Sequence, residues 1–237
     1  MQYIKIKERI IAQIESGLFT SGKKLPSERK MAQAFATTRV TIREALSALE
    51  AEARIYREVR RGWFICPKPL RYDPHLTLNF LQMAKLQGRG ASTTLLMAQR
   101  TLATQQTANL LRVPLLSELY HLIRVRYLDQ RPVVYVINYI KAYYFENFLD
   151  VDFTPSLTLA YQKHYSVSYQ STHYRVSSTS LFGDAATALR AKQGSPAMLV
   201  ERVNYDKQGR LIDCDLEYWR HDALCIESVA QFIPLPS

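Results

Sequence analysis

Only three of the 237 residues are cysteines, and their spacing fits neither a disulfide framework nor a metal-ligand motif. No apolar run approaches the ~18 residues that a membrane-spanning helix needs, and the first residues form no apolar leader. The sequence also contains no glycine-rich phosphate loop, no nucleophile paired with a base and no histidine cluster. We therefore expect a cytoplasmic protein with no membrane partner, no metal, no cofactor and no catalytic residues.

The chain is basic, with 31 Lys and Arg against 21 Asp and Glu and a net charge of +10. The first 66 residues hold 13 Lys and Arg and 7 Asp and Glu, so this quarter of the chain carries +6 of that charge. A hydrophobic content of 47% is enough for a full core and argues against disorder. The uneven charge indicates an anionic partner that meets the N-terminal segment.

Three helices are predicted in the first fifty residues. The helix over 3–16 repeats isoleucine at every fourth position, and Ser27 is a suitable N-cap for a short helix over 27–35. After a tight turn, Thr38 can cap a third helix. That helix carries an apolar stripe at i, i+3, i+4 and i+7, made of Ile42, Ala45, Leu46 and Leu49. Two stripes joined by a short turn predict a helix-turn-helix.

A small hairpin should follow the helices. Residues 55–59 and 63–65 are β-prone, and Arg60, Arg61 and Gly62 lie between them as a basic tip. Three helices and such a hairpin make a winged helix-turn-helix over 1–65. The three prolines in 66–75 predict a semi-rigid linker, which leaves 76–237 as a second domain.

The second domain alternates long strands with helices. Strands are predicted at 93–101, 118–128, 133–141, 168–180, 197–206 and 211–220, and helices at 76–86, 104–112, 156–164 and 184–192. The short turns at 130–132 and 207–210 should join antiparallel neighbours. We expect an α+β domain with a mainly antiparallel sheet and flanking helices.

The third helix carries Arg39 and Arg43 one turn apart. Arg43 lies well off the apolar stripe, and Arg39 lies nearer its edge but in the first turn, where a side chain can still reach outward. A guanidinium matches O6 and N7 of guanine or grips a phosphate, and the hydroxyls of Thr38 and Thr41 can bond phosphates or base edges. Arg29 begins the preceding helix and could hold the flanking backbone. A solvated basic face would explain one such helix. The helices, the basic hairpin and the local charge together favour DNA binding.

Three motifs in this segment resemble the N-terminal domain of the GntR family of bacterial transcription regulators. They are Leu25-Pro26-Ser27-Glu28-Arg29, Thr38 to Leu46, and Gly62 to Ile65. Arg60 stands where the family often has the first glycine of its wing. The resemblance implies that the recognition helix and its surroundings contact DNA through Arg29, Thr38, Arg39, Val40, Thr41 and Arg43. It also implies that the tip formed by Arg60, Arg61 and Gly62 approaches the minor groove.

In the predicted strand over 118–128, Arg124 and Arg126 share one face. They can converge on a single anion, and Ser156 at a helix start could join them through its hydroxyl and the following amides. Alternatively, they pair across the sheet with Asp215 and Glu217 of the last long strand. The sequence leaves both readings open.

The second domain resembles the UTRA effector-binding domain of HutC-type GntR regulators, which shares its fold with chorismate lyase. The resemblance rests on residues 122–127 with 131–133, on 155–157, and on 205–209 with 212–213 and 219–222. It implies a small anionic effector, such as a phosphonate, a sugar phosphate or a carboxylic acid. The implied anion ligands are Ser92, Thr93, Thr94, Arg124, Arg126 and Ser156, while Asp215 or Glu217 would read a hydroxyl or amine.

These observations favour a bacterial, effector-responsive transcription regulator, and the resemblance favours a repressor. Because one DNA-binding domain contacts only a few base pairs, we expect a homodimer that binds a pseudo-palindromic operator in double-stranded DNA. We expect the protein to be associated with the nucleoid through this operator. A DNA-binding protein without a ligand is one alternative. A chorismate-lyase-like enzyme is another, disfavoured because the sequence shows no catalytic constellation.

Overall fold

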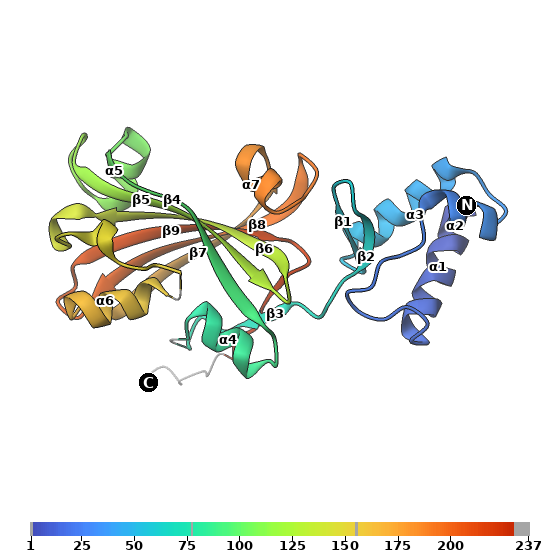
Figure 1. Cartoon of the computed structure of the whole chain (residues 1–237), viewed down its shortest axis with the longest axis horizontal. Coiled ribbons are helices and arrows are strands. Elements are labelled where there is room, and N and C mark those ends of the chain that lie inside the picture. The colour runs from blue at the N-terminus through green and yellow to red at the C-terminus, as the bar shows by residue number, and fades with distance from the viewer. Residues whose placement is uncertain (1, 77, 155, 230–237) are drawn as a thin grey trace, which may run out of the picture.

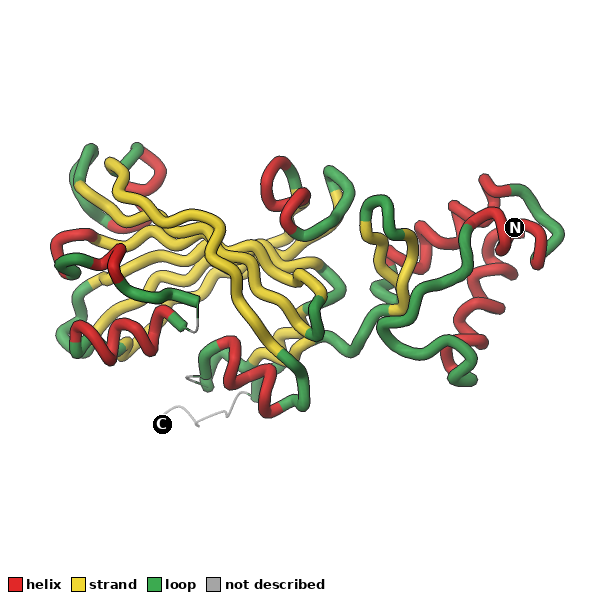
Figure 2. Tube along the Cα trace, viewed as in Figure 1, coloured by secondary structure: helices red, strands yellow, loops and turns green. Residues whose placement is uncertain are grey.

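The computed structural model describes residues 2–76, 78–154 and 156–229, and these form two parts joined by a short connection (Figures 1 and 2). The N-terminal part contains α1 (Gln2–Glu15), α2 (Glu28–Ala34), α3 (Arg39–Ala51) and the hairpin of β1 (Ile55–Glu58) and β2 (Gly62–Ile65). The predicted winged helix-turn-helix is confirmed.

The core of this part is built on the stripe of α3. Ile42, Ala45, Leu46 and Leu49 are fully buried against residues of α1, β1 and β2. Burying one such side chain stabilises the fold by about 1.5–3 kcal/mol. The stripe therefore fixes which face of α3 points inward and which points to solvent.

The C-terminal part is a six-stranded antiparallel sheet with four helices. Its strands are β4 (Ala91–Leu102), β5 (Glu118–Leu128), β6 (Arg131–Lys141), β7 (Tyr169–Leu181), β8 (Ser195–Asp206) and β9 (Leu211–Arg220), in the order β4-β5-β6-β9-β8-β7. Its helices are α4 (Phe80–Leu86), α5 (Gln105–Leu111), α6 (Leu157–Tyr165) and α7 (Gly183–Ala188), with 3₁₀ turns η1 (Ala142–Tyr144) and η2 (Phe148–Asp150). The predicted hairpins β5–β6 and β8–β9 are confirmed.

The four helices divide between the two faces of the sheet: α4 and α6 lie on one side, α5 and α7 on the other (Figure 1). The arginines of β5 and the acidic residues of β9 point to the side of α4 and α6, while Val125 and Cys214 point to the other. None of the described helices is long and apolar enough to cross a membrane.

Part of the predicted linker belongs to the C-terminal domain. Residues Leu70–Tyr72 form β3, which pairs in parallel with β10 (Leu224–Ile226) near the other end of the chain. Leu70 is fully buried in the core below α4. The helix predicted from residue 76 begins instead at Phe80, because Asn79 caps it in a reciprocal capping box with Gln82.

Candidate functional site

The first turn of α3 presents its polar side chains to solvent. Thr38 caps the helix, since its Oγ1 accepts a hydrogen bond from the amide of Thr41 over 3.2 Å. The side chains of Arg39 and Arg43 are 60% and 57% exposed, and Val40 is 64% exposed. Arg29 and Thr41 are also at the surface or near it. The predicted DNA-contacting residues at the start of α3 therefore form one accessible edge, and Arg29 is exposed on α2.

Glu28, which the sequence reasoning did not assign, organises this edge. Its Oε2 accepts a hydrogen bond from Nε of Arg43 at 2.7 Å and lies 3.8 Å from Nη2 of Arg39. Its Oε1 accepts a hydrogen bond from the indole of Trp63. Burial would raise the pKa of Glu28, but the hydrogen bonds from Arg43 and Trp63 outweigh it and the pKa lies below its ordinary value. In the sequence, the feature that could have indicated this role of Glu28 was the presence of an acidic residue in the first turn of the helix.

The wing is a two-sided hairpin. Trp63 and Ile65 face the core of the N-terminal domain, while Tyr56 and Phe64 stack on each other on the opposite side, with ring centroids 5.3 Å apart. At the tip, the side chains of Arg60 and Arg61 are exposed, and Arg60 and Gly62 adopt positive φ angles. The hairpin lies next to the C-terminal domain (Figure 1), and its aromatic side faces that domain, since Tyr56 contacts Arg131 and Arg220.

Two arginines of the C-terminal domain enclose the Tyr56 ring. The guanidinium of Arg131 lies 3.4 Å from the ring centroid and that of Arg220 lies 5.3 Å from it. Both arginines pair with Asp222. Burial would raise the pKa of Asp222, but the charges of Arg131 and Arg220 outweigh it and hold the pKa at about 2.

Backbone hydrogen bonds complete this contact, which we call the wing interface. The amide of Val59 donates to the carbonyl of Arg190 over 2.9 Å, and Arg220 donates to the carbonyl of Arg57 over 3.3 Å. Nε2 of His221 lies 2.9 Å from the carbonyl of Glu50 at the end of α3. The wing interface therefore joins the recognition helix and its hairpin to the last strand of the sheet.

A cavity of about 500 Å³ lies between the sheet and the helices α4 and α6. Five residues predicted to bind an effector line it: Thr93, Arg124, Arg126, Ser156 and Asp215. Ser156 caps α6 by accepting a hydrogen bond from the amide of Leu159. In the described part of the chain, no group of three or more His, Cys, Asp or Glu could hold a metal ion.

Three other predicted residues do not line this cavity. Ser92 and Thr94 flank Thr93 on β4 and are exposed on the opposite face, because successive strand residues point to opposite sides. Glu217 is buried beneath the cavity, beside Arg126 and Trp219. The predicted stretch Ser92 to Thr94 thus contributes only its central residue.

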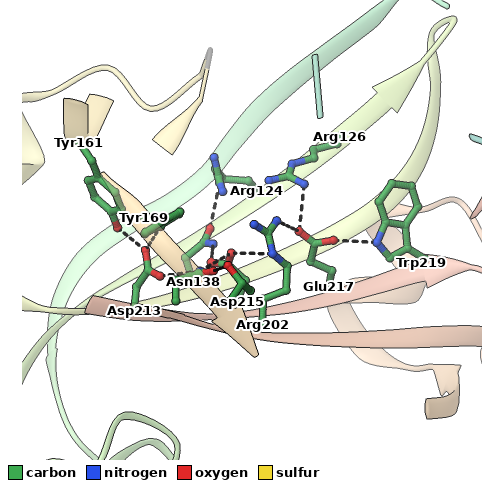
Figure 3. A network of polar contacts seen from close by, with 12 residues as sticks. Arg124, Arg126, Asn138, Tyr161, Tyr169, Arg202, Asp213, Asp215, Glu217 and Trp219 are labelled. Atoms are coloured by element: carbon green, nitrogen blue, oxygen red, sulfur yellow. Dashed lines mark hydrogen bonds and ion pairs between the residues drawn. The ribbon is translucent and has the colours of Figure 1, made fainter. Parts of the chain in front are cut away.

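Glu217 is held by three donors (Figure 3). Nη1 of Arg126 lies 3.1 Å from its Oε1, Nη1 of Arg202 lies 3.3 Å from the same atom, and the indole of Trp219 donates to Oε2 over 2.9 Å. Burial would raise the pKa of Glu217, but Arg126 and Arg202 outweigh it and the pKa is lowered. For Arg126, the ion pair across the sheet is therefore formed.

Arg124 has a different environment. The residue is only 2% exposed, and its Nε donates to Oδ1 of Asn138 over 2.9 Å. Among the described residues it forms no ion pair and no hydrogen bond from Nη1 or Nη2 (Figure 3). Burial, with a smaller contribution from Arg126, lowers the pKa of Arg124 to about 10, so the guanidinium is still charged at neutral pH. Within the described ranges of the chain, this buried cation faces the cavity without a counter-ion.

The structure adds lining residues that the sequence reasoning missed, on α4, α6, β7 and β8. They include Gln82, Gln162, Tyr169, Thr172, Tyr174 and Arg202. For Arg202, the feature that could have indicated a role in the cavity was a charged residue among the apolar residues of a predicted strand. Tyr169 and Thr172 lie on an edge strand whose side chains alternate little in polarity, so no sequence pattern indicates their role.

Comparisons with known proteins agree with this geometry. Residues 2–65 match the family model "Bacterial regulatory proteins, gntR family", and residues 86–224 match the model of the UTRA domain. The chain is 32% identical over 219 residues to the uncharacterized HTH-type transcriptional regulator YihL of Escherichia coli K12, covering 92% of this chain and 93% of YihL. It is 24% identical to the HTH-type transcriptional repressor NagR of Bacillus subtilis, over 93% of this chain and 90% of NagR.

The fold is similar to a solved structure along the whole chain. PhnF from Mycobacterium smegmatis has a TM-score of 0.67 at 22% identity, with 98% of this chain and 99% of PhnF covered. The family and these relatives are transcription regulators and not enzymes, so the lyase alternative is discarded. The chain belongs to the GntR family of bacterial transcription regulators and carries a UTRA domain behind its DNA-binding helices.

Proposed function

We propose that this regulator is a repressor that binds a pseudo-palindromic operator as a homodimer and responds to a small anionic metabolite. The observation that carries the ligand part is the buried guanidinium of Arg124, which faces the cavity and has no carboxylate partner in the part of the chain that the structure describes. Isolating a charge from water is costly unless an opposite charge compensates it, so an anion bound at Arg124 stabilises the site.

The lining of the cavity fits a small polar anion. Ser156 and the first amides of α6 lie at the same cavity, and a helix N-terminus favours negative charge. Thr93, Thr172 and Gln162 offer hydrogen bonds to further polar groups. A phosphonate, a sugar phosphate or a carboxylic acid has the required charge, and Asp215 is available to a hydroxyl or amine.

The DNA part of the proposal rests on the exposed edge of α3. Arg39 and Arg43 extend from one helical turn, as direct readout of neighbouring bases requires. One α3 helix spans only a few base pairs, so two copies on two half-sites supply the affinity of a specific complex. The relative NagR is a transcriptional repressor, which supports repression as the sign of control.

Binding to DNA is expected to depend steeply on salt. Operator affinity should fall roughly 10³-fold or more between about 50 and 200 mM salt, because cationic side chains displace counter-ions from the phosphates. Fluorescence anisotropy with the DNA upstream of the protein's own gene and with a random duplex measures both affinity and preference. A flat salt titration, or equal affinity for both duplexes, contradicts the proposal.

The wing interface is the proposed route by which the effector acts on the DNA-binding domain. Strand β9 carries Asp215 at the cavity, Glu217 in contact with the cavity residue Arg126 and, three residues after Glu217, Arg220 against Tyr56. A change in the position of β9 on effector binding therefore reaches the wing directly. Such control requires the effector to bind the docked and undocked arrangements with different affinities.

Replacing Tyr56 with alanine should undock the wing. Each cation–π contact contributes about 0.5–2 kcal/mol, so losing the ring between Arg131 and Arg220 weakens docking strongly. We expect the amide of Val59 to exchange with deuterium ~5–30-fold faster, as follows from a loss of one to two kcal/mol. Hydrogen-exchange mass spectrometry measures this rate.

The matched control is Tyr143→Ala, because Tyr143 is 66% exposed and lies on η1, outside the wing interface. In the Tyr143→Ala variant, the amide of Val59 should exchange with deuterium at the wild-type rate. Equal exchange rates in Tyr56→Ala and Tyr143→Ala would show that Tyr56 does not hold the wing in place.

A further inference from the structure

The cavity holds three arginines, and two of them are neutralised within the protein. Arg126 and Arg202 both contact Glu217, and Nε of Arg202 also lies 3.9 Å from Asp215. Arg124 is the most deeply buried of the three, yet its one hydrogen bond among the described residues goes to an uncharged amide. Among the described residues, the arginine that is most deeply buried, and that most needs an opposite charge, is thus the one without a carboxylate partner.

Asn138 is the residue that produces this difference. It lies on β6, the strand between β5 and β9, and is fully buried. Its Oδ1 accepts the hydrogen bond from Nε of Arg124, and its Nδ2 donates to Oδ1 of Asp215 (Figure 3). One neutral side chain therefore stands between the guanidinium and the nearest acidic residue of β9.

A second amide keeps the acidic side of this network in place. Nδ2 of Asn204 donates to Oδ1 of Asp213 over 2.7 Å and lies 3.3 Å from Oδ2 of Asp215. Asp213 also accepts hydrogen bonds from the hydroxyls of Tyr161 and Tyr169. Because two asparagines donate to it and Arg202 lies close by, Asp215 is anchored away from Arg124.

We infer that Asn138 is a positioning residue that holds Arg124 in its binding orientation and prevents an internal ion pair with Asp215. The inference rests on the proposed function, in which Arg124 receives the effector's anion. A carboxylate in the place of the amide would pair with Arg124 through charge-assisted hydrogen bonds. It would also repel an anion entering the cavity. The neutral amide fixes the guanidinium plane through Nε and leaves both Nη groups for the ligand.

The test uses inorganic phosphate as the probe and calorimetry on the full-length protein. Asn138→Asp changes one atom of the side chain and adds a negative charge, so we expect phosphate to bind roughly 100-fold more weakly or worse. Operator affinity without phosphate should stay within about twofold of wild type, since the hydrogen bonds of Asn138 go to Arg124 and Asp215, away from the exposed edge of α3. This second readout verifies that the variant is folded.

A double variant separates the position of the charge from its amount. Asn138→Asp combined with Asp215→Asn exchanges the two groups, preserving both the net charge of the cluster and a donor–acceptor pair between these strands. We expect phosphate binding to stay as weak as in the single variant, because the carboxylate still adjoins Arg124. Recovery of wild-type affinity would overturn the inference.

The remaining outcomes distinguish this inference from the proposed function. If the wild type and Asn138→Asp bind phosphate equally well, the inference alone is overturned. If the wild type binds no phosphate in the millimolar range, both the anionic effector and the role of Asn138 are rejected. Asn138→Gln, which keeps a neutral amide, should retain part of the affinity that Asn138→Asp loses.

Discussion

Arg124→Ala abolishes the response to the anionic effector and leaves operator binding intact; this is the largest effect that we expect. Removing one partner of a buried, hydrogen-bonded charge pair costs about 2–5 kcal/mol, equivalent to a ~30-fold to several-thousand-fold loss of affinity. Phosphate binding by calorimetry, and operator affinity with and without a panel of phosphates, phosphonates and carboxylic acids, measure the loss. The buried position of Arg124 explains the size of the effect.

Arg175→Ala is the control for this experiment. Arg175 lies on β7 with its side chain 68% exposed, so its removal takes away the same charge without touching the cavity. Arg124→Met, which fills more of the vacated space, guards against a folding defect in the alanine variant. Full inducibility of both Arg124 variants would remove this residue from the effector site.

Arg39→Ala and Arg43→Ala are each expected to weaken operator binding by about 1–3 kcal/mol, roughly 5–150-fold. Both side chains are more than half exposed, so the fold should be unaffected. A contact to a base edge should also relax the preference at one position of the half-site, whereas a phosphate contact weakens all sequences equally. Anisotropy titrations against single-base operator variants distinguish the two.

Arg54→Ala is the matched control, because Arg54 is exposed just beyond the opposite end of α3. This substitution removes the same charge from the same domain but leaves the exposed edge at the start of α3 unchanged. If Arg39→Ala and Arg43→Ala bind the operator no worse than Arg54→Ala, the edge of α3 is not the reading surface.

The pattern of the sequence was sufficient for most of the fold. Thr38 was predicted as a cap and caps α3, and the stripe from Ile42 to Leu49 is buried as its spacing required. Strict alternation in β5 placed Arg124 and Arg126 on one face, and the structure confirms this arrangement. These features depend on neighbours within a few residues, which a single sequence displays.

Features that depend on distant partners were not predictable. Whether an arginine of β5 pairs with a carboxylate of β9 depends on the strand register and on the residue of β6 between them. Glu217 reaches Arg126, whereas Asn138 separates Arg124 from Asp215. The pairing of β3 with β10 was missed for a similar reason, because two three-residue strands some 150 positions apart leave no periodic signal.

The same β3–β10 pairing limits how far a DNA-binding domain can travel. Because β2 ends at Ile65 and β3 begins at Leu70, the tether consists of four residues, which span at most about 14 Å when fully extended. Two half-sites lie one helical turn of DNA apart, about 34 Å. In the proposed dimer, the tethers therefore allow each DNA-binding domain to change its angle. The larger spacing between the two DNA-binding domains is determined by how the two effector domains pack against each other.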